Sequence, residues 1–263
     1  FVLPSSVFRP REARGHQDDD AALKTMALAS KVAIVTGASG TIGAAIATHL
    51  ARAGANVVVS ARRVDKLEAL RTELGGDRCE AVGADVTDEA SVAALFERAA
   101  ARFERVDVLV NAAGVAINGP TTQLSASDFR RVLDVNVVGA FLVSREAFRH
   151  KTPRVINVGS ISARAPRPDS AAYTASKFAL DGLTRSLALD GRALGIAVSV
   201  VHPGNVASEL LSPEEFAWRK DREGLCSADD VAACVVLMAG APDGTNVLEV
   251  TVMPTTQPLV GRG

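Results

Sequence analysis

One short stretch of the sequence holds three side chains that together could transfer a proton. Ser160 lies just beyond the apolar run 155–158, and Tyr173 and Lys177 follow it, four residues apart. On a helix, that spacing puts the phenol and the ammonium group on the same face, one turn apart. A free tyrosine has a pKa near ~10, and a fixed cation beside it favours the phenolate and lowers that value. Ser160, Tyr173 and Lys177 are therefore candidate catalytic residues, and Tyr173 is the only tyrosine of the chain.

The spacing Tyr-x-x-x-Lys alone is more typical of an ordinary helix with an exposed lysine, so the surrounding elements matter. Apolar runs predict strands over 32–36, 56–60, 78–84, 106–111, 154–160, 196–201 and 247–252. Between them we expect helices over 41–53, 64–74, 87–102, 125–149, 173–194 and 227–238, with N-caps at Thr87, Ser125 and Ser227. This alternation predicts the α/β class, a doubly wound parallel sheet of seven strands in a single domain, residues 26–263. Its ligand should bind at the carboxyl ends of the strands.

The composition argues against several classes of function. The chain has 29 Lys and Arg against 30 Asp and Glu, and the two signs are interspersed, which disfavours nucleic-acid binding and electrostatic membrane binding. Cys79, Cys226 and Cys234 show no metal-ligand spacing, so we expect reduced buried thiols, no disulfide and no metal site. No apolar run reaches the ~18 residues of a membrane span.

Residues 1–25 differ from the rest of the chain in composition. They contain Pro4, Pro10, several arginines and the run 18–20 of three aspartates, with little periodicity. We expect a leader that is disordered, a cloning remnant or the tail of a targeting sequence, and Met26 as a plausible true start. The expected location is cytoplasmic, or organellar if residues 1–25 belong to a targeting sequence.

A glycine-rich turn joins the first predicted strand to the first predicted helix. Backbone N–H groups and the positive end of the helix suit a pyrophosphate there. The expected cofactor contacts are Gly37, Ser39, Gly40, Thr41, Ile42 and Gly43. After the second strand, where many NAD-binding chains carry an acid, this sequence has Arg62. Arg62 could pair with a 2′-phosphate, which favours NADP over NAD, or it could be a solvated loop arginine.

Polar and small residues follow the third and fourth strands. Asp85, followed by Val86, could accept a hydrogen bond from an adenine amino group, cap the next helix, or do both. Small residues in the run Asn111-Ala112-Ala113-Gly114 would let a cofactor pass over the sheet edge, although a plain turn has the same pattern. Asn136 lies within an apolar helix, where it could hold a water molecule in a proton relay or be a satisfied buried amide.

In this order, the motifs resemble those of the short-chain dehydrogenase/reductase family, from Lys31 to about Pro258. The resemblance implies a Rossmann-type fold and a catalytic tetrad of Asn136, Ser160, Tyr173 and Lys177. It implies that Lys177 binds the nicotinamide ribose and lowers the pKa of Tyr173.

The resemblance also covers the segment after the sixth strand. It implies that Pro203, Gly204 and Val206 lie beside the nicotinamide and that Ser208 lies near the carboxamide. The run 246–257 looks like the branch of NADP-dependent serine and 3-hydroxy-acid dehydrogenases. One departure is Thr41, which stands where the family usually has the middle glycine of the turn.

The function implied is an NADP(H)-dependent oxidoreductase. It would transfer a hydride between the nicotinamide and a small alcohol or carbonyl substrate, with Tyr173 as general acid and base. One alternative is a sensor or scaffold that binds NADP(H) without turnover. Another is an enzyme that uses the same residues for epimerisation or dehydration.

The substrate segment and the assembly follow from the same resemblance. We expect specificity from residues 208–225, with apolar contacts from Leu210, Leu211, Phe216 and Trp218 and anion contacts from Arg219, Lys220 and Arg222. The family implies a homodimer or homotetramer built on a four-helix contact of helices 127–149 and 173–194.

Overall fold

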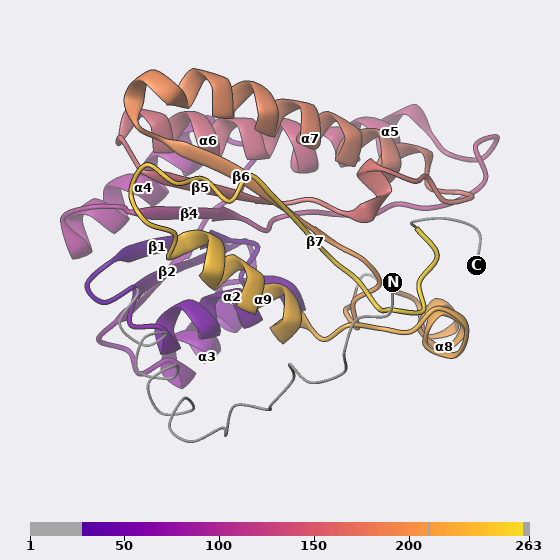
Figure 1. Cartoon of the computed structure of the whole chain (residues 1–263), viewed down its shortest axis with the longest axis horizontal. Coiled ribbons are helices and arrows are strands. Elements are labelled where there is room, and N and C mark those ends of the chain that lie inside the picture. Colours follow the sequence, from indigo (N-terminus) through magenta and orange to yellow (C-terminus); the bar gives the residue numbers. More distant parts are fainter. Residues whose placement is uncertain (1–27, 210, 260–263) are drawn as a thin grey trace, which may run out of the picture.

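The computed structural model describes residues 28–209 and 211–259 of the chain. In this part, one parallel sheet has the strand order β3-β2-β1-β4-β5-β6-β7 (Figure 1). The order reverses between β1 and β4, and this confirms the predicted doubly wound sheet of seven strands in one domain. The strands are β1 (Val32–Thr36), β2 (Asn56–Ala61), β3 (Cys79–Gly83), β4 (Val108–Asn111), β5 (Arg154–Val158), β6 (Ala197–Pro203) and β7 (Glu249–Val252).

Helices cover both faces of the sheet (Figure 1). They are α2 (Thr41–Arg52), α3 (Val64–Glu73), α4 (Glu89–Phe103), α5 (Ala126–Leu133), α6 (Ala140–Arg149), α7 (Ala171–Gly191), α8 (Pro213–Arg222) and α9 (Ala228–Ala239). Figure 1 shows α2, α3 and α9 below the sheet and α5, α6 and α7 above it. The described residues also form the π-helical turn η1 (Asp134–Gly139) and the 3-10 turns η2 (Ile161–Ala163) and η3 (Arg192–Leu194).

Successive side chains of a strand point to opposite faces of the sheet, and each face has its own core. Val35 and Val57 belong to the core beneath α2 and α9, whereas Ile34 and Val58 belong to the core beneath α4, α6 and α7. Every residue of β1, β4 and β5 is buried, as expected for parallel strands with both faces covered. These central strands end at the edge where the predicted site residues lie.

Two predicted helix features differ from the structure. The N-cap of α4 is Asp88, not Thr87, because the Asp88 carboxylate accepts from the backbone N–H groups of Ala90 and Ser91. The predicted long helix 125–149 does begin after Ser125, but η1 is a π-helical turn between α5 and α6. Such wider turns in helices often mark functional sites, and this one contains Asn136.

The cysteines follow the prediction only in part. All three are free, but only Cys79 is fully buried, whereas Cys226 and Cys234 are half-buried. Burial raises the pKa of the Cys79 thiol to about 11, so this thiol is protonated and unreactive at neutral pH.

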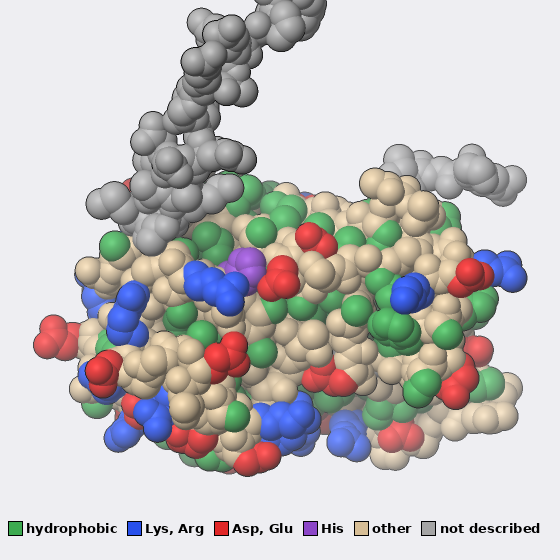
Figure 2. All heavy atoms as spheres, turned by 90° about the horizontal axis from the view of Figure 1, so that it is seen from below, with side chains coloured by type: hydrophobic (Ala, Val, Ile, Leu, Met, Phe, Trp, Pro, Cys, Tyr) green, Lys and Arg blue, Asp and Glu red, His purple; other side chains and the backbone are tan. Residues whose placement is uncertain are grey.

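The surface and the ends of the chain bear on the other expectations. Seen from below the sheet, acidic and basic side chains are interspersed with apolar ones (Figure 2). Among the described residues, none of the helices combines the length and apolar character that a bilayer crossing requires. The predicted leader and Met26 lie outside the described residues.

Candidate functional site

A cavity of about 540 Å³ lies at the carboxyl ends of the strands. It is lined by residues from the segments that follow β1 to β6, as the sheet topology requires. Most of the predicted site residues line it: Gly37, Ser39, Gly40, Thr41, Ile42, Gly43, Arg62, Asp85, Val86, Ala112, Gly114, Ser160, Tyr173, Lys177, Pro203, Gly204, Val206 and Ser208.

The turn between β1 and α2 requires its glycines. Gly37 has φ +67, and a Cβ there would lie 2.6 Å from the backbone nitrogen of Ala113. A Cβ on Gly43 would lie 2.3 Å from the carbonyl oxygen of Gly37. Side chains larger than hydrogen would therefore push the turn away from the strands that support it. Thr41 opens α2 directly after this turn, so the departure from the family pattern leaves the helix N-terminus at the cavity.

The chain itself places a carboxylate at this helix N-terminus. Glu209 accepts from the backbone N–H of Thr41 at 3.0 and 3.2 Å and from the Thr41 hydroxyl, and it lies 3.8 Å from Arg63. Burial favours the neutral acid, but the hydrogen bonds from Thr41 and the Arg63 charge outweigh it and lower the pKa of Glu209. The position therefore holds an anion, which is the property that a pyrophosphate site needs. Sequence reasoning missed Glu209, because 168 residues separate it from Thr41.

The two arginines after β2 have different environments. Arg62 is exposed and lines the cavity. Arg63, which the sequence reasoning did not select, donates from Nη2 to the Ser39 carbonyl oxygen at 2.8 Å and to the Ser39 hydroxyl at 3.2 Å. Arg63 thus stabilises the glycine turn through its hydrogen bonds to Ser39, whereas the Arg62 side chain is available to a ligand of the cavity.

Asp85 lies at the cavity and does not cap the next helix. Its carboxylate lines the cavity and accepts from the backbone N–H of Thr87 at 3.0 Å and from the Thr87 hydroxyl at 2.7 Å. These hydrogen bonds lower the pKa of Asp85. The capping role for the next helix belongs to Asp88 instead.

Ser160, Tyr173 and Lys177 come together from two elements. Ser160 is the N-cap of η2, and its hydroxyl accepts from the backbone N–H of Ser162 at 3.1 Å. Tyr173 and Lys177 lie on α7, one turn apart, as their spacing predicted. The Lys177 Nζ donates to the carbonyl oxygen of Val158 at 2.9 Å and lies 5.5 Å from the centre of the Tyr173 ring.

The direction of the Tyr173 pKa shift is opposite to the expectation. Burial raises the pKa of Tyr173 and outweighs the hydrogen bond with Ser160 and the charges of Arg167 and Arg219, which lower it. Burial also lowers the pKa of Lys177 to about 8. The phenol is therefore protonated at neutral pH in the protein alone.

Two predicted asparagines do not line the cavity. Asn136 Oδ1 accepts from the Val115 N–H at 2.8 Å, and Nδ2 donates to the Val115 carbonyl and to the Ser176 hydroxyl. Both Nδ2 hydrogens are in use, so the Asn136 side chain is a satisfied buried amide, and its role in a proton relay stays a prediction. Asn111 is buried and donates to the Ser144 hydroxyl and to Asn157, so its predicted contact with a cofactor is replaced by packing beneath the site.

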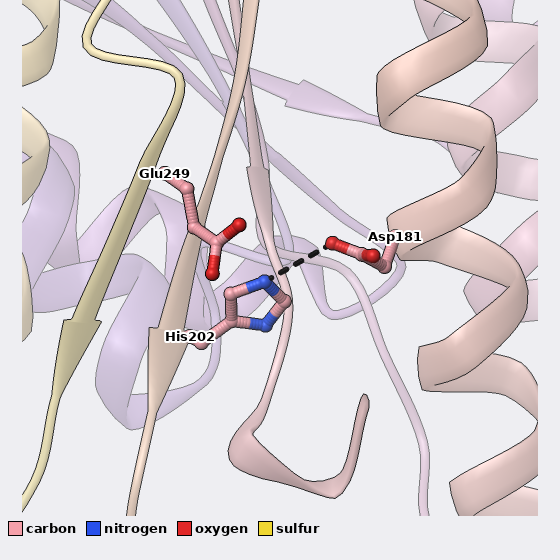
Figure 3. A group of neighbouring side chains, drawn as sticks. All are labelled: Asp181, His202 and Glu249. Atoms are coloured by element: carbon pink, nitrogen blue, oxygen red, sulfur yellow. Dashed lines mark ion pairs between the residues drawn. The ribbon is translucent and has the colours of Figure 1, made fainter. Parts of the chain in front are cut away.

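A buried histidine that sequence reasoning missed lies behind Ser160. The Nδ1 atom of His202 is 2.9 Å from the Ser160 carbonyl oxygen, and its Nε2 atom is 3.3 Å from the Asp181 carboxylate (Figure 3). The ring occupies the space beside Gly159, where a Cβ would lie 2.6 Å from Nδ1. His202 therefore supports the backbone that carries the Ser160 hydroxyl. Burial lowers the pKa of His202.

Asp181, His202 and Glu249 together offer metal-ligand atoms within 4.8 Å of one another (Figure 3). Two guanidinium groups already bind the two carboxylates. Arg185 donates to Asp181 at 3.1 Å and to Glu249 at 2.8 Å, and Arg164 also donates to Glu249. Because the carboxylate charges are balanced in this way, we assign no metal ion to the cluster.

The predicted substrate segment contributes fewer residues than expected. Leu211 and Arg219 line the cavity, as does Glu215. Among the described residues, Phe216, Trp218, Lys220 and Arg222 do not belong to the lining. Leu210 lies outside the described residues. Arg167, from the segment before α7, also lines the cavity and was not predicted.

Comparison with protein families shows one matching family, described as short chain dehydrogenase, over residues 31–217. A farnesol dehydrogenase from Aedes aegypti is 36% identical over 242 residues, which cover 86% of this chain and 96% of the relative. A cis-4-hydroxycyclohexanecarboxylate dehydrogenase from Sinomonas cyclohexanicum is 38% identical over 227 residues, which cover 81% of this chain and 90% of the relative.

Solved structures share the fold. The crystal structure of a 3-ketoacyl-(acyl-carrier-protein) reductase from Brucella melitensis, complexed with NADH, has a TM-score of 0.81 and 30% sequence identity. The match covers 88% of this chain and 99% of that chain.

Proposed function

Because the chain belongs to the short-chain dehydrogenase family, an oxidoreductase family acting on CH–OH groups, we propose that it interconverts a small alcohol and its carbonyl with NADP(H). The observation that carries the proposal is the convergence of Ser160, Tyr173 and Lys177 on a cavity that also contains the anion position at Thr41. The α2 N-terminus suits the pyrophosphate of a nicotinamide cofactor, because it already binds an anion, the chain's own Glu209 carboxylate, whose place the pyrophosphate would take.

The proposed mechanism assigns one step to each side chain. The nicotinamide, when bound, supplies or accepts the hydride. Tyr173 donates its phenolic proton to the oxygen of a carbonyl substrate, and it takes the proton back when the alcohol is oxidised. The Ser160 hydroxyl donates a hydrogen bond to the same oxygen as negative charge develops there. The raised pKa of Tyr173 keeps the phenol protonated at neutral pH, which is the form that reduction needs.

We propose that Lys177 acts through its position and its charge. Its ammonium group is held by the Val158 carbonyl on the face of α7 that carries Tyr173. A cation there stabilises the phenolate that forms when Tyr173 gives up its proton. Asn136 would act indirectly. Its side-chain amide forms hydrogen bonds with both Val115 and Ser176 and so holds the segments of these two residues together.

The direct test of the proposed function is turnover with a panel of aliphatic and cyclic ketones and their alcohols. We expect NADPH absorbance to fall with ketones and to rise from NADP⁺ with alcohols. A protein that binds NADPH but turns over no member of the panel would be the sensor or scaffold. Product formation without any net change in cofactor absorbance would indicate epimerisation or dehydration.

The preference for NADP over NAD depends on Arg62 in this proposal. We expect Arg62→Gln to weaken NADPH binding about 10- to 100-fold, because charge-assisted hydrogen bonds to a phosphate are lost, and to leave NADH binding unchanged. Fluorescence titration of the two reduced cofactors measures both constants. Equal losses for NADPH and NADH would contradict the assignment.

Glu209→Gln is the matched control for Arg62→Gln, because Glu209 lies at the α2 N-terminus, where we expect the pyrophosphate, and not at the expected 2′-phosphate position. It removes the carboxylate charge that faces Thr41 and Arg63 while keeping the size of the side chain. Since NADPH and NADH share the pyrophosphate, we expect both to bind more tightly to this variant, and by the same factor.

We propose a homodimer or homotetramer. Val138 and Phe141 around η1 and α6, and Phe178 and Leu189 on α7, are exposed apolar side chains that a contact between copies would cover. Light scattering should give a dimer or tetramer mass that moves toward the monomer in Phe178→Glu. The exposed Leu237 lies on α9, so Leu237→Glu should keep the native mass. A monomeric native protein would reject the proposal.

We propose that the chain belongs to the branch of NADP-dependent serine and 3-hydroxy-acid dehydrogenases, because the run 246–257 resembles that branch.

A further inference from the structure

Two guanidinium groups line the cavity close to Tyr173. Arg167 comes from the segment between η2 and α7, and Arg219 comes from α8. Both line the cavity together with Ser160 and Tyr173, and the charges of both lower the pKa of Tyr173. Each side chain is mostly buried, with 26% exposure for Arg167 and 16% for Arg219.

The two groups converge on one neutral acceptor. Arg167 Nη2 donates to Asn205 Oδ1 at 2.6 Å, and Arg219 Nη1 donates to the same oxygen at 3.3 Å. An amide oxygen carries no net charge, so it orients the two cations without neutralising them. Burial lowers the pKa of Arg167, and the neighbouring Arg219 charge lowers it further.

In the described part of the chain, the nearby carboxylates leave several N–H donors of the Arg167 and Arg219 guanidinium groups without an acceptor. Glu223 forms an ion pair with Arg167 at 3.7 Å without a hydrogen bond, and its Oε2 accepts from Asn205 Nδ2 at 2.8 Å. Glu215 accepts from Arg219 at 3.1 Å, but its other oxygen accepts from the Ser212 N–H at the start of α8. Within residues 28–209 and 211–259, Arg167 donates one hydrogen bond, whereas a guanidinium has five N–H donors.

The cofactor's phosphates do not account for these arginines. Arg62 follows β2 and Arg167 follows the end of β5, and β1 and β4 lie between those strands. Three strand spacings separate the ends of β2 and β5, which is roughly 14 Å along the sheet edge. The Arg62 charge acts on Asp85, which follows β3, whereas the charges of Arg167 and Arg219 act on Tyr173, so these two arginines lie in the part of the cavity that contains Tyr173.

We propose that the substrate carries a carboxylate, which binds Arg167 and Arg219 while its carbonyl or hydroxyl group faces Ser160 and Tyr173. The inference rests on the proposed function and names its substrate class: a hydroxy acid and the corresponding oxo acid. Planar guanidinium forks match a carboxylate with paired hydrogen bonds, and a carboxylate between the two cations removes their mutual repulsion. Leu211 supplies an apolar wall for the body of such an acid.

Binding of a non-reacting acid tests the inference separately from turnover. Ligand-observed NMR titrations with cyclohexanecarboxylate, cyclohexanecarboxamide and inorganic phosphate are done on the full chain, with and without NADP⁺. We expect the carboxylate to bind about 10- to 100-fold more tightly than the amide of the same shape, and more tightly than phosphate. Arg167→Gln and Arg219→Gln should each remove that advantage.

Two further sets of variants keep the test decisive. Arg222→Gln, on the same helix but 70% exposed and outside the cavity lining, should bind the acid as the native protein does. If either Gln variant unfolds, Arg167→Lys and Arg219→Lys keep the charge, and we expect intermediate affinity because the planar fork is lost.

Equal binding of acid and amide, equal binding of phosphate, or unchanged binding in both Gln variants would overturn the inference. The proposed function would stand in those cases if neutral ketones were reduced with NADPH. Conversely, selective acid binding without turnover of any ketone or oxo acid would leave the carboxylate site in place and reject the dehydrogenase activity.

Discussion

Replacing Tyr173 by phenylalanine should lower kcat about 10²- to 10⁴-fold, the range that a positioned general acid contributes, and should leave NADPH binding unchanged. The change deletes one oxygen atom, and the ring that packs beside Lys177 remains. Stopped-flow turnover of the best ketone and fluorescence titration of NADPH provide the two measurements. A variant with near-native kcat would remove the phenol from the mechanism.

The same side chain permits a direct measurement of its protonation. Since Tyr173 is the only tyrosine, the tyrosinate absorbance of the chain gives a single curve against pH, and Tyr173→Phe should abolish it. The midpoint in the cofactor-free protein should lie above that of free tyrosine, because burial raises the pKa of Tyr173. A midpoint below the free value would show that the Lys177 charge outweighs burial.

Replacing Lys177 by methionine should abolish most activity and change how stability depends on pH. The folded-state pKa of Lys177 is about 8, below the ordinary value of 10.5, because the ammonium group is buried. Between these two values the unfolded chain holds a proton that the folded chain has lost. The free energy of unfolding of the native protein should therefore rise with pH across this window, relative to Lys177→Met.

We expect that relative gain in the free energy of unfolding to be about 3 kcal/mol. A difference of one between the folded and unfolded pKa corresponds to about 1.36 kcal/mol, and the Lys177 pKa falls from 10.5 to about 8. Urea unfolding of the native protein and of Lys177→Met at pH 7 and pH 10.5 measures it as a double difference. Because the Tyr173 phenol titrates in an overlapping range, the comparison is repeated in the Tyr173→Phe background. Parallel pH dependence of the two proteins would show that Lys177 keeps an ordinary pKa in the folded state.

For catalysis, the charge of Lys177 should matter more than its contact with Val158. We expect kcat of Lys177→Met to fall by about the same factor as kcat of Tyr173→Phe, 10²- to 10⁴-fold, if the lysine acts only through the phenol. The double variant should then be no slower than either single one, because residues that act as a unit are not additive.

The sequence alone determined the fold and the positions of the main reactive groups. Apolar runs separated by helical segments specify a parallel sheet with both faces covered, and all seven predicted strands are present. The glycine turn and the pair Tyr173 and Lys177 are local features, in which a few neighbouring residues set the backbone geometry. Spacing along one helix was enough to place the phenol and the ammonium group one turn apart.

Only the tertiary structure decided the environment of these groups. Glu209 reaches Thr41, Arg167 and Arg219 meet at Asn205, and His202 supports Ser160, and each contact joins residues from different elements. Asn111 and Asn136 have the residue types of a polar site, but packing directs their amides into hydrogen bonds outside the cavity. The pKa of Tyr173 depends on burial, which no pattern of neighbouring residues specifies, and so its direction could not be predicted from the spacing to Lys177.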